Sequence, residues 1–166
     1  MLTKILALSL ILAGCGGSAK PAATAPPAAA ATARKGLQIR LTTIYVDDQA
    51  KALRFYTDVL GFAKKDDETN GPYRWITVTS PSEPNGTELQ LAANDDPAAK
   101  AYQQAKFKNN EPAIMFYTDD IKADYERIKA LGAEFTSPPT EVMPGSTIAT
   151  LKDTCGNFIQ LTQLDR

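Results

Sequence analysis

One pattern occurs twice in this chain of 166 residues, at a nearly constant spacing of about 70 residues. The matching segments are 46–48 with 118–120, 60–61 with 131–132, and 86–91 with 156–161. In each copy, a strand ends in an acidic residue pair, a helical stretch ends in Leu-Gly, and a later glycine precedes an apolar strand. Three matches at one spacing are typical of a duplicated structural unit. The sequence therefore predicts two similar modules within one domain.

Each module is predicted to run strand, helix and three further strands. Asp48 is placed to cap the first helix, and Gly61 stands where a helix-ending glycine is expected. In module one, at about 37–95, the predicted strands are 37–46, 62–65, 73–79 and 88–92. In module two, at about 112–164, they are 113–118, 134–135, 147–151 and 158–162, with a helix over 121–131. A linking helix over about 97–107 is predicted between the modules.

The repeated motifs resemble those of a known superfamily. Module one carries Val46-Asp47-Asp48, Phe55-Tyr56 and Leu60-Gly61-Phe62, and module two carries Leu131-Gly132-Ala133 and the block from Asp153 to Leu161. These segments resemble the vicinal oxygen chelate superfamily, which includes glyoxalase I, bleomycin-resistance proteins and extradiol dioxygenases. The resemblance covers about residues 37–164. It implies an α+β fold in which two βαβββ modules form an open cup of mixed sheets with the helices outside.

In metal-dependent members of that superfamily, four side chains from the first and last strands of both modules hold an ion in the cup. Carried over by motif, these positions are Leu41, Gln90, Ala113 and Gln160. Leu and Ala have no ligand atom, and two neutral amides bind divalent ions weakly. We therefore expect no metal and no other cofactor; a divalent ion held by the two glutamines and Glu88 is the alternative. Glu88 is also the one candidate catalytic group, as a general base if burial raises its pKa.

Strand alternation predicts which side chains line the cup. Those expected on its open face are Leu41, Thr43, Tyr45, Trp75, Thr77, Glu88, Gln90, Ala113, Met115, Tyr117, Phe158 and Gln160. The opposite faces are apolar throughout, which suits packing against helices. Apolar walls with a few polar groups are the usual composition of a small-ligand site. The alternative is a cup that is filled by its own side chains or by a dimer seam.

Composition excludes several kinds of chemistry. The chain has no histidine, so it contains no Ser-His-Asp triad, no Cys-His dyad and no His metal ligand. Its 18 basic and 19 acidic side chains give a net charge of −1 without a basic cluster, so nucleic acid is not an expected partner. Cys155 has no histidine to activate it and is expected to be a structural thiol.

The first residues are predicted to be a targeting segment. Lys4 precedes a short apolar run, 5–12, which is well below the roughly 20 residues of a membrane-spanning helix. Residues 12–15 resemble the lipobox of bacterial lipoproteins, which implies a signal peptide at 1–14 and a lipid on Cys15. An Ala/Pro-rich tether at 15–36 then leads to the domain at 37–166. We expect a lipid-anchored protein of the cell envelope, on the outer membrane facing the periplasm if the host is Gram-negative.

One function is expected, with two alternatives. The expected function is metal-independent binding of a small organic molecule in the cup, as bleomycin-resistance members do. The first alternative is an enzyme, a glyoxalase-type lyase or dioxygenase with an atypical metal site. The second is a non-catalytic interaction module. The sequence leaves open whether the cup forms within one chain or across a homodimer. The candidate partners are therefore a small molecule, the lipid membrane through Cys15 and a second copy of the chain.

Overall fold

The structure is a computed structural model that describes residues 36–165. The predicted signal peptide at 1–14, the lipidation site Cys15 and all of the tether except Gly36 lie outside the described residues. The expected lipidation and localisation therefore stay predictions. No helix within the described residues is long and apolar enough to cross a membrane.

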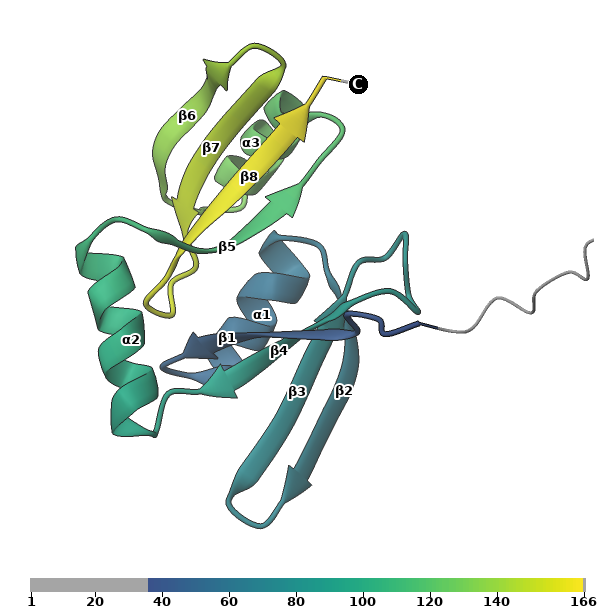
Figure 1. Ribbon diagram of the computed structural model, residues 1–166, viewed down its shortest axis with the longest axis vertical. Coiled ribbons are helices and arrows are strands. Elements are labelled where there is room, and N and C mark those ends of the chain that lie inside the picture. The colour runs from purple at the N-terminus through teal and green to yellow at the C-terminus, as the bar shows by residue number, and fades with distance from the viewer. Residues whose placement is uncertain (1–35, 166) are drawn as a thin grey trace, which may run out of the picture. The chain divides into compact units, whose positions relative to one another are not determined.

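Module one forms a four-stranded sheet, sheet A, with one helix packed on it (Figure 1). Its elements are β1 (Leu41–Val46), α1 (Gln49–Arg54), the π-helical turn η1 (Phe55–Val59), β2 (Ala63–Asn70), β3 (Tyr73–Thr79) and β4 (Glu88–Ala93). The strand order across the sheet is β1-β4-β3-β2. β1 and β4 are parallel, and the other neighbours are antiparallel.

Module two repeats this arrangement as sheet B after the linking helix α2 (Pro97–Lys108). Its elements are β5 (Pro112–Tyr117), α3 (Ile121–Ala130), β6 (Phe135–Met143), β7 (Ser146–Lys152) and β8 (Phe158–Leu164), with strand order β5-β8-β7-β6. Again the first and last strands are parallel. These two mixed sheets confirm the predicted α+β fold of two βαβββ modules, and the sheets do not close into a barrel.

The repeated Asp and Gly positions mark helix ends, as predicted. The carboxylates of Asp48 and Asp120 each accept the backbone N–H three residues ahead, at 2.9 and 3.0 Å. Asp96 caps α2 in the same way. Gly61 and Gly132 follow the helices with the same φ of +90°, a conformation that residues with a side chain rarely adopt. The two modules therefore share the backbone conformation at these positions as well as the sequence motif.

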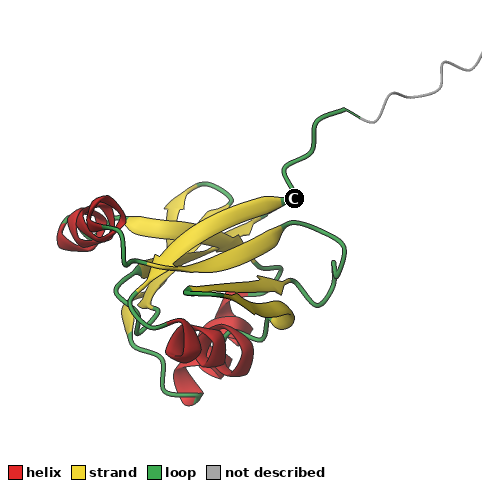
Figure 2. Ribbon diagram, turned by 90° about the horizontal axis from the view of Figure 1, so that it is seen from below, coloured by secondary structure: helices red, strands yellow, loops and turns green. Residues whose placement is uncertain are grey.

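The apolar strand faces form the core, as alternation predicted. Eight of these side chains are buried: Ile44, Val46, Ile76, Val78, Leu89, Leu91, Ile159 and Leu161. Ile114 and Phe116 pack against them, and Tyr56, Ile121 and Ile128 reach the same core from the helices of both modules. Figure 2 shows two helices gathered on one side of the strands and a third helix apart from them. The other face of each sheet is therefore free of α1 and α3.

The linking helix α2 lies beside β1 and β5 rather than on the core face (Figure 1). Its buried side chains include a polar one, Gln103. The amide nitrogen of Gln103 donates to the backbone oxygens of Tyr45 and Cys155, both at 2.8 Å, and its oxygen accepts from Asn94 at 2.6 Å. One glutamine thereby attaches the helix to strand ends of both modules.

The strand boundaries differ from the prediction at three places. β1 begins at Leu41 rather than at 37, because its partner β4 begins at Glu88 and pairs first with Leu41. β2 and β6 are much longer than the predicted 62–65 and 134–135, because each forms a hairpin with the following strand. Both are edge strands with mainly exposed side chains, so no apolar alternation marks them in the sequence.

The first helix also changes its winding halfway. After Arg54 the backbone continues as a π-turn, in which the N–H of Leu60 donates to the oxygen of Phe55. The hydroxyl of Thr57 donates to the oxygen of Leu53 at 2.9 Å, a local bond that competes with regular helix bonding. The turn buries Phe55 and Tyr56 together, where a regular helix would face them about 100° apart.

Candidate functional site

The helix-free faces of the two sheets expose several large apolar side chains. Leu41 and Trp75 of sheet A are 40% and 42% exposed, and Met115 and Tyr117 of sheet B are 54% and 66% exposed. The predicted cup residues Thr43, Tyr45, Glu88, Gln90, Ala113 and Gln160 are also at least partly exposed. A gathering of exposed apolar side chains among polar ones is typical of a binding surface.

Two predicted cup residues are closed off from solvent. Thr77 is fully buried, and its hydroxyl donates to the carboxylate of Asp66 at 3.1 Å. Phe158 is 5% exposed, because the ring of Phe107 from α2 stacks on it with 4.6 Å between ring centroids. Strand alternation predicted the sheet face of Thr77 and Phe158. It could not predict that a neighbouring strand and the linking helix cover these side chains.

The four positions that hold a metal in relatives carry no set of ligands here. Leu41 lies opposite Glu88 across sheet A, and Ala113 lies at a strand irregularity beside Pro112. Gln90 accepts the Thr43 hydroxyl at 2.9 Å. Gln160 donates to the Met115 sulfur at 3.3 Å and to the Thr162 hydroxyl at 3.2 Å. Both amides are engaged with neighbours on their own sheet. Within residues 36–165, no three His, Cys, Asp or Glu side chains come together as a metal-binding group.

Glu88 is an ion-paired carboxylate. The ammonium group of Lys65, on the edge strand β2 beyond β3, lies 2.7 Å from it. The hydrogen bond from Lys65 lowers the pKa of Glu88, and its partial burial opposes this only in part. The pKa therefore moves in the direction opposite to the one that a general base at this position would need. The donor set of the cup, one paired carboxylate and two amides, does not fit a divalent ion.

A cleft of about 840 Å³ lies around Trp75 of sheet A and extends to Gln49 of α1 and Pro97 of α2. We call it the Trp75 cleft. Its lining includes Tyr73, Trp75, Gln90, Glu68 and Asp95, so it combines two aromatic rings with polar and acidic groups. Its volume falls within the roughly 300–1,000 Å³ of sites for drug-sized ligands.

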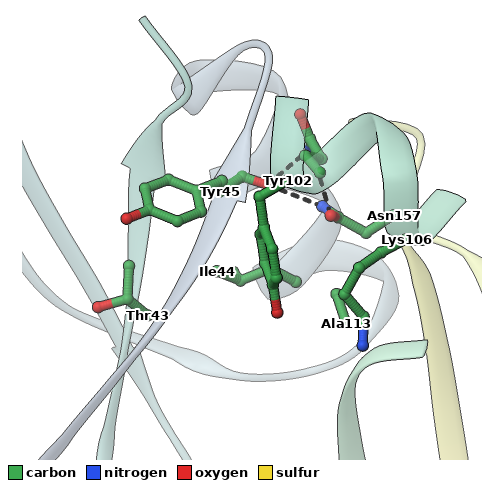
Figure 3. Close-up of a pocket in the computed structure, with 8 residues that line it drawn as sticks. Thr43, Ile44, Tyr45, Tyr102, Lys106, Ala113 and Asn157 are labelled. Atoms are coloured by element: carbon green, nitrogen blue, oxygen red, sulfur yellow. Dashed lines mark hydrogen bonds between the residues drawn. The ribbon is translucent and has the colours of Figure 1, made fainter. Parts of the chain in front are cut away.

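A second, smaller pocket of about 260 Å³ lies where β1, α2 and β5 meet, and we call it the junction pocket (Figure 3). It is lined by Thr43, Ile44, Tyr45, Tyr102, Gln103, Lys106, Ala113 and Asn157. Figure 3 shows the side chain of Tyr102 between that of Tyr45 on one side and that of Lys106 on the other. Thr43, Tyr45 and Ala113 belong to the predicted cup, so the pocket is continuous with the helix-free faces.

The floor of the junction pocket is a network of buried amides. Asn157 donates to the Tyr45 oxygen at 2.9 Å and to the Asp153 carboxylate at 2.7 Å. Asp153 also accepts the backbone N–H groups of Cys155 and Asn157 and the hydroxyl of Tyr56. Burial raises the pKa of Asp153, against the effect of these hydrogen bonds. No buried side-chain nitrogen or oxygen in the described chain lacks a hydrogen-bond partner, so this floor is rigid.

Sequence reasoning missed Tyr102, Gln103 and Lys106, because the linking helix was interpreted only as a connection. The signal available in the sequence was the spacing of four between Tyr102 and Lys106, which places both on one face of the predicted helix. Cys155, by contrast, matches its expectation. It is buried, and burial raises the pKa of its thiol to about 12, so it carries no thiolate near neutral pH.

Family comparison agrees with this fold. Residues 38–161 match the model of the Glyoxalase/Bleomycin resistance protein/Dioxygenase superfamily, and the chain belongs to it. The resemblance found in the sequence is thereby confirmed.

Three relatives illustrate the range of that superfamily. The protein YurT of Bacillus subtilis strain 168 is 50% identical over 127 residues, which are 76% of this chain and 99% of YurT. A probable lactoylglutathione lyase of Vibrio cholerae is 33% identical over 125 residues, 74% of this chain and 87% of the lyase. The crystal structure of TnmS3, an antibiotic binding protein from Streptomyces sp. CB03234, has a TM-score of 0.63 and 26% identity, covering 79% of this chain and 98% of TnmS3.

Proposed function

We propose that this protein binds a small organic molecule, without a metal ion, on the helix-free side of its sheets. The observation that carries this proposal is the exposure of Leu41, Trp75, Met115 and Tyr117 on those faces. Exposed aromatic side chains beside hydrogen-bonding groups suit a ligand with flat apolar parts and a few polar atoms. The likeness to an antibiotic binding protein supports the same kind of ligand.

The proposal is metal-independent because of the chemistry of the donor set. Two of the four ligand positions, Leu41 and Ala113, have no oxygen, nitrogen or sulfur in their side chains. Binding an ion through Glu88 would require breaking its pair with Lys65. Ligand binding by apolar contact and hydrogen bonds needs neither change.

A second copy of the chain completes the binding side in this proposal. One chain leaves its helix-free faces open, and Met115 and Tyr117 are more than half exposed. If the helix-free sides of two chains faced each other, the side chains of Met115 and Tyr117 would be removed from water, and a ligand would be enclosed between the chains. Sedimentation velocity should then give a dimer, and Tyr117→Asp should shift it to a monomer, while Leu131→Asp on α3 should not. A wild-type monomer at high concentration would contradict this part.

The proposal also includes anchoring through Cys15. Stable attachment needs more than one acyl chain, and a lipoprotein cysteine carries several. Metabolic labelling of the full chain with a palmitate analogue in a bacterial host should mark the wild type and not Cys15→Ser. Labelling of both, or of neither, would argue against lipidation at this residue.

The central experiment measures binding by the protein of residues 37–166, which carries the whole described core. Bleomycin and a panel of aromatic antibiotics are titrated by calorimetry, with and without EDTA. We expect saturable binding of at least one compound that EDTA does not change. No binding at about 1 mM, a limit of only about −4 kcal/mol, would contradict the proposal.

Two variants locate the binding. Trp75→Ala removes the largest exposed ring of the Trp75 cleft and should weaken binding at least tenfold. Leu131→Ala removes a somewhat more exposed apolar side chain, at the end of α3, and should leave binding unchanged. The circular dichroism and melting temperature of both variants show whether each keeps its fold.

A second candidate function is a lyase, favoured by the 33% identity to the probable lactoylglutathione lyase. It requires a bound metal and turnover of lactoylglutathione. Metal analysis of the purified protein, together with that assay in the presence of Zn, Ni, Mn and Fe(II), separates the two functions. About one equivalent of metal with turnover would favour the lyase.

A further inference from the structure

We propose that the junction pocket binds an aromatic carboxylate, the ring lying against Tyr45 and Tyr102 and the carboxylate meeting Lys106. This inference rests on the proposed function, because it names a ligand class for one part of the same binding side. It concerns residues of α2, which the proposal above does not use.

The walls of the pocket suit an aromatic ring. Tyr45 of β1 and Tyr102 of α2 both line the pocket. Tyr102 is 57% exposed, an unusual position for a ring that only fills a core. Neither phenol hydroxyl makes a hydrogen bond to another residue among those described, so both can serve a ligand. The volume of about 260 Å³ is small enough to select a single ring.

The charge in the pocket is positive. Among its lining residues, Lys106 is the one with a charged side chain, and no carboxylate lines it. Lys106 is already paired with Glu111, but at 3.4 Å and with Glu111 55% exposed. Such a loose, exposed pair contributes little, and an ammonium group has three donors to share. An anionic group on the ring would therefore gain a charge-assisted hydrogen bond, whereas a cationic one would be repelled.

The geometry of the pocket is fixed before a ligand arrives. Gln103 and Asn157 both donate to the backbone oxygen of Tyr45. The bond from Gln103 attaches α2 to β1, the strand that carries Tyr45. The bond from Asn157 attaches the turn before β8 to the same strand. Because all these amides are satisfied, binding need not reorganise the floor. On the protein side, the cost of binding then comes from ordering the side chains of Tyr102 and Lys106.

Four small probes separate the possible ligand chemistries. Benzoate carries a ring and a negative charge, benzyl alcohol a neutral ring, benzylamine a ring and a positive charge, and acetate the carboxylate alone. Each is titrated into ¹⁵N-labelled protein of residues 37–166, and amide resonances are followed by NMR. We expect benzoate to bind with a Kd of about 1 mM, as is reasonable for so small a ligand. Its shifts should centre on Tyr45, Tyr102 and Lys106, and the other three probes should bind at least fivefold more weakly.

Three variants test the role of the lysine. Lys106→Met keeps the length of the side chain and should weaken benzoate binding about tenfold, the value of one charge-assisted hydrogen bond. Lys106→Arg should restore most of the affinity. Lys108→Met removes a lysine of the same helix that does not line the pocket and should have no effect. Tyr102→Ala should weaken both benzoate and benzyl alcohol.

Each contrary result overturns the inference. These are equal binding of benzoate and benzyl alcohol, no loss in Lys106→Met, or shifts that centre on Trp75 instead of Tyr45. If no benzoate binds but an antibiotic still binds in the calorimetric experiment, the inference is wrong and the proposed function stands. If neither binds, both are wrong.

Discussion

The two modules share a fold but differ in the loop that precedes the last strand. In module two this loop, residues 153–157, is largely buried and bonds to module one through Asp47, Tyr56 and Tyr45. In module one the matching loop, residues 80–87, is largely exposed, and it forms hydrogen bonds with residues of module one, among them Ile39 and Thr79. The duplicated unit has thus become asymmetric: one loop joins the modules, and the other faces solvent.

The first residues of the last strands differ in the same way. Phe158 begins β8 and is covered by Phe107 of the linking helix. Its counterpart Glu88 begins β4 and pairs with Lys65 near the surface. Module two therefore uses this position for packing, and module one keeps it polar. The comparison teaches that a repeat predicts backbone structure at matching positions but not the environment of their side chains.

The largest change in the free energy of unfolding is expected when Phe158, the buried residue of the matched positions Phe158 and Glu88, is truncated. Phe158→Ala removes a ring that is 5% exposed and leaves a cavity, so it should lower the free energy of unfolding by about 4 kcal/mol. Glu88→Ala, at the matching position, should have a much smaller effect, because it breaks a partly exposed ion pair. Urea denaturation of both variants checks this. Equal losses would mean that the two positions are equivalent after all.

The joining loop should depend strongly on its buried carboxylate. Asp153→Ala leaves several donors without an acceptor, among them the N–H of Cys155 and the amide of Asn157. We expect a loss of about 3 kcal/mol in the free energy of unfolding. Glu83→Ala changes the matching position of the exposed loop and should have little effect. A comparable loss in Glu83→Ala would remove the asymmetry between the loops.

The contribution of Asp153 should also depend on pH. Because the pKa of Asp153 is raised on folding, the folded protein takes up this proton at a higher pH than the unfolded chain. Stability from this group is present below its ordinary pKa of 3.8 and is lost as the pH rises through the raised value. The stability difference between wild type and Asp153→Ala should therefore be larger below pH 3.8 than at pH 8. A difference that grows with pH would contradict the assigned shift.

At positions where the two modules have the same conformation, matched substitutions should lower the free energy of unfolding by the same amount. Gly61 and Gly132 end the two helices with a φ of +90°, and an added Cβ would meet no atom closer than 3.9 Å at either. Gly61→Ala and Gly132→Ala should each lower the free energy of unfolding by about 1 kcal/mol through backbone strain alone. Thermal or urea denaturation measures both. A clear difference between them would show that the helix ends are not equivalent.

The smallest effect is expected at the surface pair of module one. Lys65 lowers the pKa of Glu88, so the pair stabilises the fold above the ordinary value of 4.5 and loses this effect as the pH falls through the lowered pKa. Lys65→Met should therefore be slightly less stable than the wild type at pH 7 and equal to it at low pH. High salt should also shrink the difference. A difference that persists at low pH would point to packing by the Lys65 stem instead.

Most of the fold could be predicted from the sequence, since the signals are local. The aspartate caps, the Leu-Gly helix ends and the apolar alternation of the inner strands each depend on a few neighbouring residues. The lengths of β2 and β6 could not be predicted, because only their hairpin partners define them. The acidic run Asp66, Asp67 and Glu68 is typical of a loop, and only its pairing with β3 in the structure identifies it as part of a strand.

The candidate site was predictable only where it lies on regular strands. Alternation placed Thr43, Tyr45 and Trp75 on a helix-free face, because the period of a strand fixes its faces. It could not place Tyr102 and Lys106, which reach the same space from a helix nearly sixty residues away from β1. Nor could it show that Lys65 would pair with Glu88, because that contact depends on the register of β2, β3 and β4.

The attachment of α2 through Gln103 has a consequence for how such a protein could change. Both strong bonds of the Gln103 amide nitrogen go to main-chain carbonyls, which every amino acid supplies. The attachment of α2 through Gln103 therefore does not depend on the side chains of Tyr45, Tyr102 and Lys106. Substitutions of these three residues would alter which compound binds and would leave the fold intact. Ligand specificity can therefore change during evolution without loss of stability.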